Sequence, residues 1–125
     1  MRDEDFKEFL KRQVTATFAG LSADEVARCI IAYEPVWAIS TTLGAKPDTP
    51  ESALESINVI RETLAKSYKL KAISCLYGGS VTSINVREFL ENDGFDGVLI
   101  GGASVNKEEF VKILSTAYAL ETGSP

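Results

Sequence analysis

The chain reads AISCLYGGS from residue 72 to residue 80, an apolar run that ends in two glycines and a serine. The run 72–77 predicts a buried β-strand, and the glycines predict a tight turn at its carboxyl end. A short helix is expected directly afterwards, around Ile84–Leu90. The stretch therefore predicts one strand–turn–helix unit of an α/β fold.

A similar unit precedes this stretch. Cys29–Tyr33 is an apolar run without alternation, typical of a parallel strand that is covered on both faces. A helix is then expected from an N-cap at Thr49, with Pro50 in its first position, to about Tyr68. An amphipathic helix over Asp5–Ala19 comes before both. The upstream half therefore predicts a helix followed by a strand–helix unit.

A third unit closes the chain. Asp96–Ile100 predicts a strand that ends in Gly101-Gly102, and a last helix is expected over Lys107–Leu120. A helix followed by three strand–helix units predicts right-handed crossovers and parallel strands. No linker or repeat divides the sequence, so we expect one domain over 1–125. The side chains expected to face inward from the last helix are Phe110, Ile113, Leu114 and Ala117.

The composition excludes several classes of function. Apolar residues make up 45% and the net charge is −5, which argues against nucleic acid or an anionic membrane as the main partner. No run approaches the roughly 20 apolar residues of a membrane span, and the charged start MRDED is not typical of a signal peptide. We expect a cytoplasmic protein. Cys29 and Cys75 are expected to be buried, reduced thiols, and without any histidine they predict no metal and no cofactor.

Two glycine turns, Gly78-Gly79-Ser80 and Gly101-Gly102, follow successive strands and precede helices. Glycine lets the backbone approach a ligand with its N–H donors, and helix N-termini beyond such turns favour anions. Either turn alone is better explained by the steric need for glycine in a tight turn. Two turns on successive units favour a shared phosphate site.

Glu34 lies where the first strand ends, before a turn fixed by Pro35. A carboxylate at this position is a candidate general base, and the alternative is a solvated acid at a strand end. The long loop 36–48 carries Trp37 and Ile39, which either cover the site as a lid or fix the loop to the core.

Three motifs give the chain a resemblance to a known family. AYEPVWAI at 32–39 resembles the catalytic strand and lid hinge of triosephosphate isomerase. YGGSV at 77–81 and DGVLIGGAS at 96–104 resemble its seventh and eighth strands with their phosphate loops. The resemblance covers nearly the whole chain and implies a partial TIM barrel, roughly half a barrel, from around the fifth helix to the eighth strand and helix.

The resemblance also implies an activity, the glycolytic interconversion of dihydroxyacetone phosphate and glyceraldehyde 3-phosphate. Glu34 would be the base that moves protons between the two substrate carbons. Ile39, on the closed lid, and Leu99 would press on that carboxylate and raise its basicity by desolvation. The lid and its hinge would comprise Pro35, Val36, Trp37, Ala38 and Ile39.

The same resemblance implies the phosphate ligands. Backbone N–H groups of Ser80, Gly101 and Gly102 would bind the phosphate, and Tyr77 with Ser80 would hold the closed lid. Ser40 stands where the family has a phosphate-binding glycine, so its N–H is a candidate ligand whose geometry is less free. The serine in place of glycine would affect closure of the lid.

A larger departure concerns the electrophilic side of the site. The family is the standard example of a glutamate base paired with a neutral histidine, and this sequence contains no histidine. The lysine and asparagine expected after the family's first strand have no equivalent either. Copies of the chain cannot supply a histidine to one another, so very weak activity alone is expected, with recovery only through a complementing N-terminal half.

Three functional readings stay open. The chain is an isomerase that needs that second half, a non-catalytic half-barrel that oligomerises and binds phosphate, or a piece of a protein without a function of its own. A partial barrel leaves two open sheet edges and an apolar inward face, so a homo-oligomer is expected. The possible ligand is a phosphorylated triose.

Overall fold

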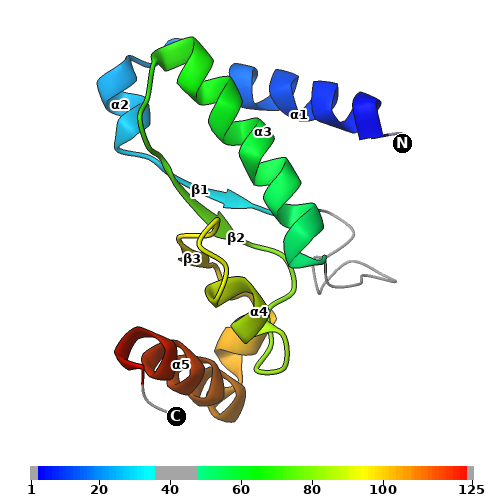
Figure 1. The fold of residues 1–125 in the computed structure, drawn as a ribbon, viewed down its shortest axis with the longest axis vertical. Coiled ribbons are helices and arrows are strands. Elements are labelled where there is room, and N and C mark those ends of the chain that lie inside the picture. The colour runs from blue at the N-terminus through cyan, green and yellow to red at the C-terminus, as the bar shows by residue number, and fades with distance from the viewer. Residues whose placement is uncertain (1–2, 36–47, 124–125) are drawn as a thin grey trace.

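A computed structural model describes residues 3–35 and 48–123. Figure 1 shows two helices packed on one side of a small sheet and a third long helix at the opposite end of the molecule. The elements are α1 (Asp3–Thr17), α2 (Ala23–Ala27), β1 (Ile30–Tyr33), α3 (Pro50–Tyr68), β2 (Ser74–Tyr77), α4 (Val86–Leu90), β3 (Gly97–Val98), the 3-10 helix η2 (Gly102–Val105) and α5 (Lys107–Thr122).

The sheet confirms the expected class. Its strands are parallel in the order β1-β2-β3, and Tyr77 pairs with Tyr33 on one side and Val98 on the other. The fold is therefore α/β, with three parallel strands after an N-terminal helix, consistent with a partial TIM barrel. Because the three strands are parallel, their carboxyl ends lie at the same edge of the sheet.

The helix starts expected from the sequence are present. Ser22 and Glu25 form a reciprocal capping box, in which Ser22 Oγ accepts from the Glu25 backbone N at 3.2 Å. Thr49 Oγ1 accepts from the Ser52 backbone N at 3.1 Å, directly before Pro50. These caps fix where each chain segment enters its helix, and α3 thereby begins beside the carboxyl end of β2, where the Asp48 backbone N donates to the Tyr77 hydroxyl.

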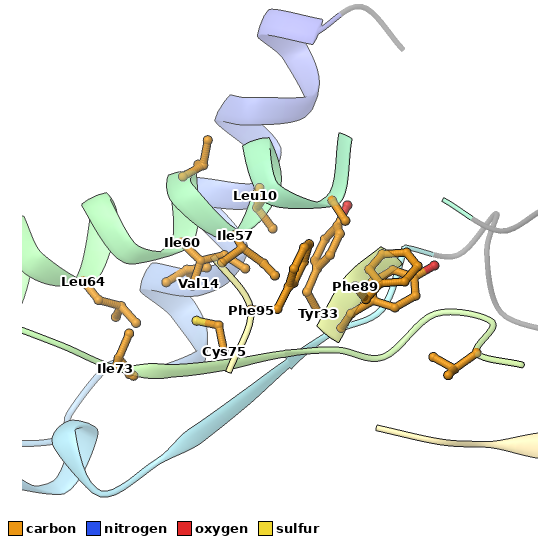
Figure 2. Packing of buried hydrophobic residues seen from close by; sticks show 14 of the residues in the cluster. Leu10, Val14, Tyr33, Ile57, Ile60, Leu64, Ile73, Cys75, Phe89 and Phe95 are labelled. Atoms are coloured by element: carbon orange, nitrogen blue, oxygen red, sulfur yellow. The ribbon is translucent and has the colours of Figure 1, made fainter. Parts of the chain in front are cut away.

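The core lies between the helices and the sheet (Figure 2). α1 contributes Leu10, Val14 and Phe18 from one stripe, as its sequence period predicts. Under the carboxyl end of β2, three rings pack together: Tyr77 stacks on Phe89 at 3.9 Å and 8°, and Phe95 meets both edge-on. The residues contributed by α3 include Ile57, Ile60 and Leu64.

A polar contact joins α3 to the last strand. Arg61 donates to the Gly94 carbonyl and to Asp96 Oδ2, the latter at 2.8 Å. The same carboxylate oxygen accepts from the Cys75 backbone N at 2.8 Å. Asp96 therefore positions β3 against both β2 and α3.

Three expectations about burial and extent are wrong. β1 is not covered on both faces, since Ile30 is 68% exposed at the sheet edge. Leu114 does not face inward but is 51% exposed, because within the described part of the chain α5 packs mainly on α4 and η2. β3 is limited to Gly97–Val98, since only these two residues pair with β2.

Two further expectations concern the burial of the cysteines and the presence of a membrane-spanning helix. Both cysteines are free thiols, but only Cys75 is buried, and Cys29 is half-buried. Burial raises the pKa of the Cys75 thiol, which keeps it protonated and unreactive at neutral pH. Among the helices of residues 3–35 and 48–123, none has the length and apolar character to cross a membrane.

Candidate functional site

A pocket of about 520 Å³ opens where the three strands end. It brings together Glu34 after β1, Ser80 after β2, and Gly101 with Gly102 after β3. The sequence predicted this convergence from parallel strands, and the structure places all four residues in one lining. The other lining residues are Gly78, Gly79, Val81, Thr82, Ala103, Asn106 and Glu109.

Glu34 is exposed and lies directly over the glycine turn that follows β2. A Cβ added at Gly78 would stand 2.7 Å from Glu34 Cγ and 3.3 Å from Glu34 Oε1. The Gly78 N–H donates to the Tyr33 carbonyl at 2.8 Å, so the glycine continues the pairing of β1 with β2. Gly78 therefore leaves room for the Glu34 carboxylate, and a side chain at this position would displace it.

The glycine turn after β3 has open space in front of it. A Cβ at Gly101 would meet no atom within 4 Å. Ser104 closes the turn, donating to the Gly101 carbonyl through its backbone N at 2.9 Å and its hydroxyl at 2.6 Å. Unlike Gly78, Gly101 is not needed for packing against the protein, so its backbone is open to a ligand that enters the pocket.

Other candidate residues lie elsewhere. Leu99 is 46% exposed and does not line the pocket, so the structure does not bring it onto Glu34. Tyr77 is fully buried below the pocket, where its hydroxyl accepts from the Asp48 backbone N at 3.2 Å. Pro35 is buried. The other lid and hinge candidates, Val36, Trp37, Ala38, Ile39 and Ser40, lie outside the described residues.

Two pocket residues were missed by the sequence reasoning, Asn106 and Glu109. Asn106 is the N-cap of α5, and its side chain accepts from the Glu109 backbone N at 3.0 Å. Glu109 in turn accepts hydrogen bonds from Ser83. An asparagine followed three positions later by an acid is a helix-start signal, and it could have placed both at this edge.

The pocket lining carries negative and no positive side chains. Glu34 and Glu109 are its charged residues, and neither lysine nor arginine is among the described residues that line it. An anion there would have to be held by backbone N–H groups and helix N-termini. Across residues 3–35 and 48–123, no group of three or more His, Cys, Asp or Glu side chains could hold a metal ion.

Comparison with known proteins gives a consistent result. The family model described as triosephosphate isomerase matches residues 1–117. The chain is 41% identical over 110 residues to triosephosphate isomerase of Lacticaseibacillus casei (strain BL23), covering 86% of this chain and 43% of that protein. It is 42% identical over 113 residues to triosephosphate isomerase of Bifidobacterium longum (strain NCC 2705), covering 88% and 41%.

A third relative extends the range of organisms. Triosephosphate isomerase of Caldanaerobacter subterraneus subsp. tengcongensis is 41% identical over 106 residues, covering 82% of this chain and 42% of that protein. The chain thus spans about two fifths of the length of the curated relatives that it matches.

Proposed function

The chain belongs to the triosephosphate isomerase family, and from this we propose that it carries the base and the phosphate cradle for interconverting dihydroxyacetone phosphate and glyceraldehyde 3-phosphate. Residues 1–125 act as one barrel-derived domain, and the reaction is the glycolytic one, in the cytoplasm. The observation that carries the proposal is the single pocket shared by Glu34, Ser80, Gly101 and Gly102.

The proposed chemistry divides between these groups. The Glu34 carboxylate takes a proton from the substrate carbon beside the carbonyl, and the electron pair of that C–H bond forms an enediolate. Once the hydroxyl proton has moved from one enediolate oxygen to the other, the protonated Glu34 returns its proton to the neighbouring carbon, which completes the change between ketose and aldose. Backbone N–H groups of Ser80, Gly101 and Gly102 hold the phosphate, so the reacting carbons stay near the carboxylate.

The neutral histidine that the family pairs with its glutamate base is absent from this sequence, so we propose that the donor to the enediolate oxygen is supplied by another polypeptide. We therefore include a complementing N-terminal half among the partners. A groove of about 480 Å³ along the open edge of β1 supports this partner, since Leu10 and Val14 of α1 and Ile30 and Ile31 of β1 line it. An added strand there would cover Ile30 and pair with the free edge.

Titration of the full chain with 2-phosphoglycolate, a phosphorylated carboxylate of substrate size, tests the phosphate cradle. Saturable binding by calorimetry is expected, together with a loss of about tenfold or more in affinity for Gly101→Ala, which adds a methyl group to a residue that lines the pocket, where no protein atom lies within 4 Å of it. The unfolding temperature is the control for folding. Saturable binding without turnover, even with the second half, would favour the phosphate-binding half-barrel; no binding by a folded wild-type chain would contradict both readings.

Without a second half, the chain is proposed to form a homo-oligomer. Val111 and Leu114 on α5 are each 51% exposed, and Tyr118 on the same helix is 68% exposed, as is Ile30 at the sheet edge. Apolar surface of this kind favours association. Light scattering of the purified chain should therefore give a mass above one chain, and a monomer that unfolds cooperatively would contradict this proposal.

A further inference from the structure

One carboxylate links the first turn of α5 to the segment that follows β2. Glu109, on α5, accepts through Oε2 from the Ser83 backbone N at 2.9 Å and through Oε1 from the Ser83 hydroxyl at 2.6 Å. Both carboxylate oxygens of Glu109 therefore accept hydrogen bonds from Ser83, which lies in the segment that follows β2. Figure 1 shows α5 beside α4, so the contact crosses between two units of the fold.

The bonds continue from Ser83 toward the pocket. The Asn85 side chain accepts from the Thr82 backbone N at 2.8 Å and donates to the Ser80 carbonyl at 2.8 Å. The segment from Ser80 to Asn85 is therefore held as one unit by its own side chains. A shift of Ser83 would move the Ser80 backbone, which is a proposed phosphate ligand.

The other end of the contact is equally fixed. The Glu109 backbone N donates to Asn106 Oδ1 at 3.0 Å, which sets Glu109 in the first turn of α5. η2 leads from Gly102 into Asn106, and the Asn106 backbone N donates to the Ala103 carbonyl at 3.3 Å. Glu109 therefore connects the segment that follows the Ser80 turn with the helix that follows the Gly101-Gly102 turn.

The negative charge of Glu109, considered alone, would weaken phosphate binding in the pocket. The hydrogen bonds from the Ser83 hydroxyl and backbone N hold the pKa of Glu109 below its usual range, so it is ionised at neutral pH. A negative charge in the lining repels a bound phosphate, and the basic residue facing Glu109 is Lys112 on its own helix. If Glu109 had no positional role, removing its charge would strengthen phosphate binding.

We infer that Glu109 is a positioning residue, which holds the Ser80 turn at the correct distance from Gly101-Gly102 so that both turns bind one phosphate. The inference rests on the proposed phosphate cradle. It adds that the cradle is held in place by a carboxylate whose own negative charge repels the bound phosphate. No direct contact between Glu109 and the ligand is required.

The deciding comparison is between Glu109→Ala and Glu108→Ala in the full chain, titrated with 2-phosphoglycolate. Glu108 is exposed on the same helix turn, so its variant removes the same charge and the same atoms without the Ser83 contact. Glu109→Ala should weaken binding about tenfold or more, while Glu108→Ala should leave it within about twofold or strengthen it slightly. Equal or tighter binding by Glu109→Ala would overturn the inference.

Glu109→Gln supplies the rescue. A glutamine can accept from the Ser83 backbone N and donate to the Ser83 hydroxyl, which works in either direction. Affinity should return to the wild-type value or exceed it, since the bridge remains and the repulsion is gone. A glutamine variant as weak as the alanine variant would contradict positioning by these bonds, because the glutamine keeps both bonds to Ser83 and would still bind weakly.

Ser83→Ala tests the contact from its other end and applies if Glu109→Ala does not fold. It removes one of the two bonds, so a loss of about threefold to tenfold in affinity is expected, with the thermal unfolding temperature reported alongside. Unchanged affinity would count against the inference. Failure of the proposed function is distinguishable, since the wild-type chain itself would then show no saturable binding.

Discussion

Gly79→Ala is expected to lower the free energy of unfolding by about 1–3 kcal/mol, the usual cost of overpacking a core. The added Cβ would overlap the Tyr77 hydroxyl and stand 2.5 Å from its Cζ. Tyr77 cannot move aside, because its side chain is fully buried and its ring is stacked on Phe89. Thermal and denaturant unfolding would show the loss, with a melting temperature lower by several degrees.

Gly78→Ala is the matched control, one position earlier in the same turn. Its Cβ would meet Glu34 Cγ at 2.7 Å and the Tyr33 carbonyl oxygen at 3.2 Å, but the Glu34 side chain is exposed and can rotate away, and the backbone contact needs a shift of only a few tenths of an ångström. A smaller loss of stability is expected, together with a displaced Glu34. Equal destabilisation by the two variants would show that the turn's backbone, rather than Tyr77, sets the cost, and would contradict this account.

Local signals in the sequence predicted most of the fold. The capping box at Ser22 and Glu25 and the Thr49 cap depend on neighbours three residues apart, so they are readable without any tertiary information. Helical periodicity also placed Leu10 and Val14 correctly in the core. These features are local, and local chemistry is what a single sequence records best.

Burial at the periphery could not be predicted in the same way. The apolar run of β1 indicated cover on both faces, yet Ile30 is exposed, since β1 is the edge strand of the sheet formed by residues 3–35 and 48–123. Leu114 has the period of an inward residue, yet α5 has too few neighbours to cover it. An apolar pattern shows that a face suits burial, and the rest of the assembly decides what buries it.

The residues of the candidate site also differ in whether the sequence could predict them. Glu34, Ser80 and the Gly101-Gly102 pair were predictable because parallel strands bring their carboxyl ends to one edge. Glu109 was not, since its role depends on a contact with Ser83, 26 residues away. A side chain that works through such a contact leaves no local pattern beyond the start of its helix.

The largest effect is expected for Glu34→Gln. In a mixture of the chain with a polypeptide covering the complementary part of the Lacticaseibacillus casei relative, the variant should lose about 10²–10⁴ in turnover, the usual contribution of a positioned general base. The amide keeps the size of the carboxylate but cannot take a proton from carbon. A coupled assay that follows glyceraldehyde 3-phosphate would measure the loss.

The specificity of that loss is what assigns the role to Glu34. Affinity for 2-phosphoglycolate should change by no more than a few fold, because backbone groups of the other two turns hold the phosphate. Glu55→Gln, an equal change of charge on an exposed position of α3, should leave turnover unaltered. In deuterated water the wild-type mixture should exchange the substrate's carbon-bound hydrogen, and the Glu34→Gln mixture should not. Exchange that persists in the variant would mean that another group moves the proton, and Glu34 would then be no more than a solvated acid at the end of β1.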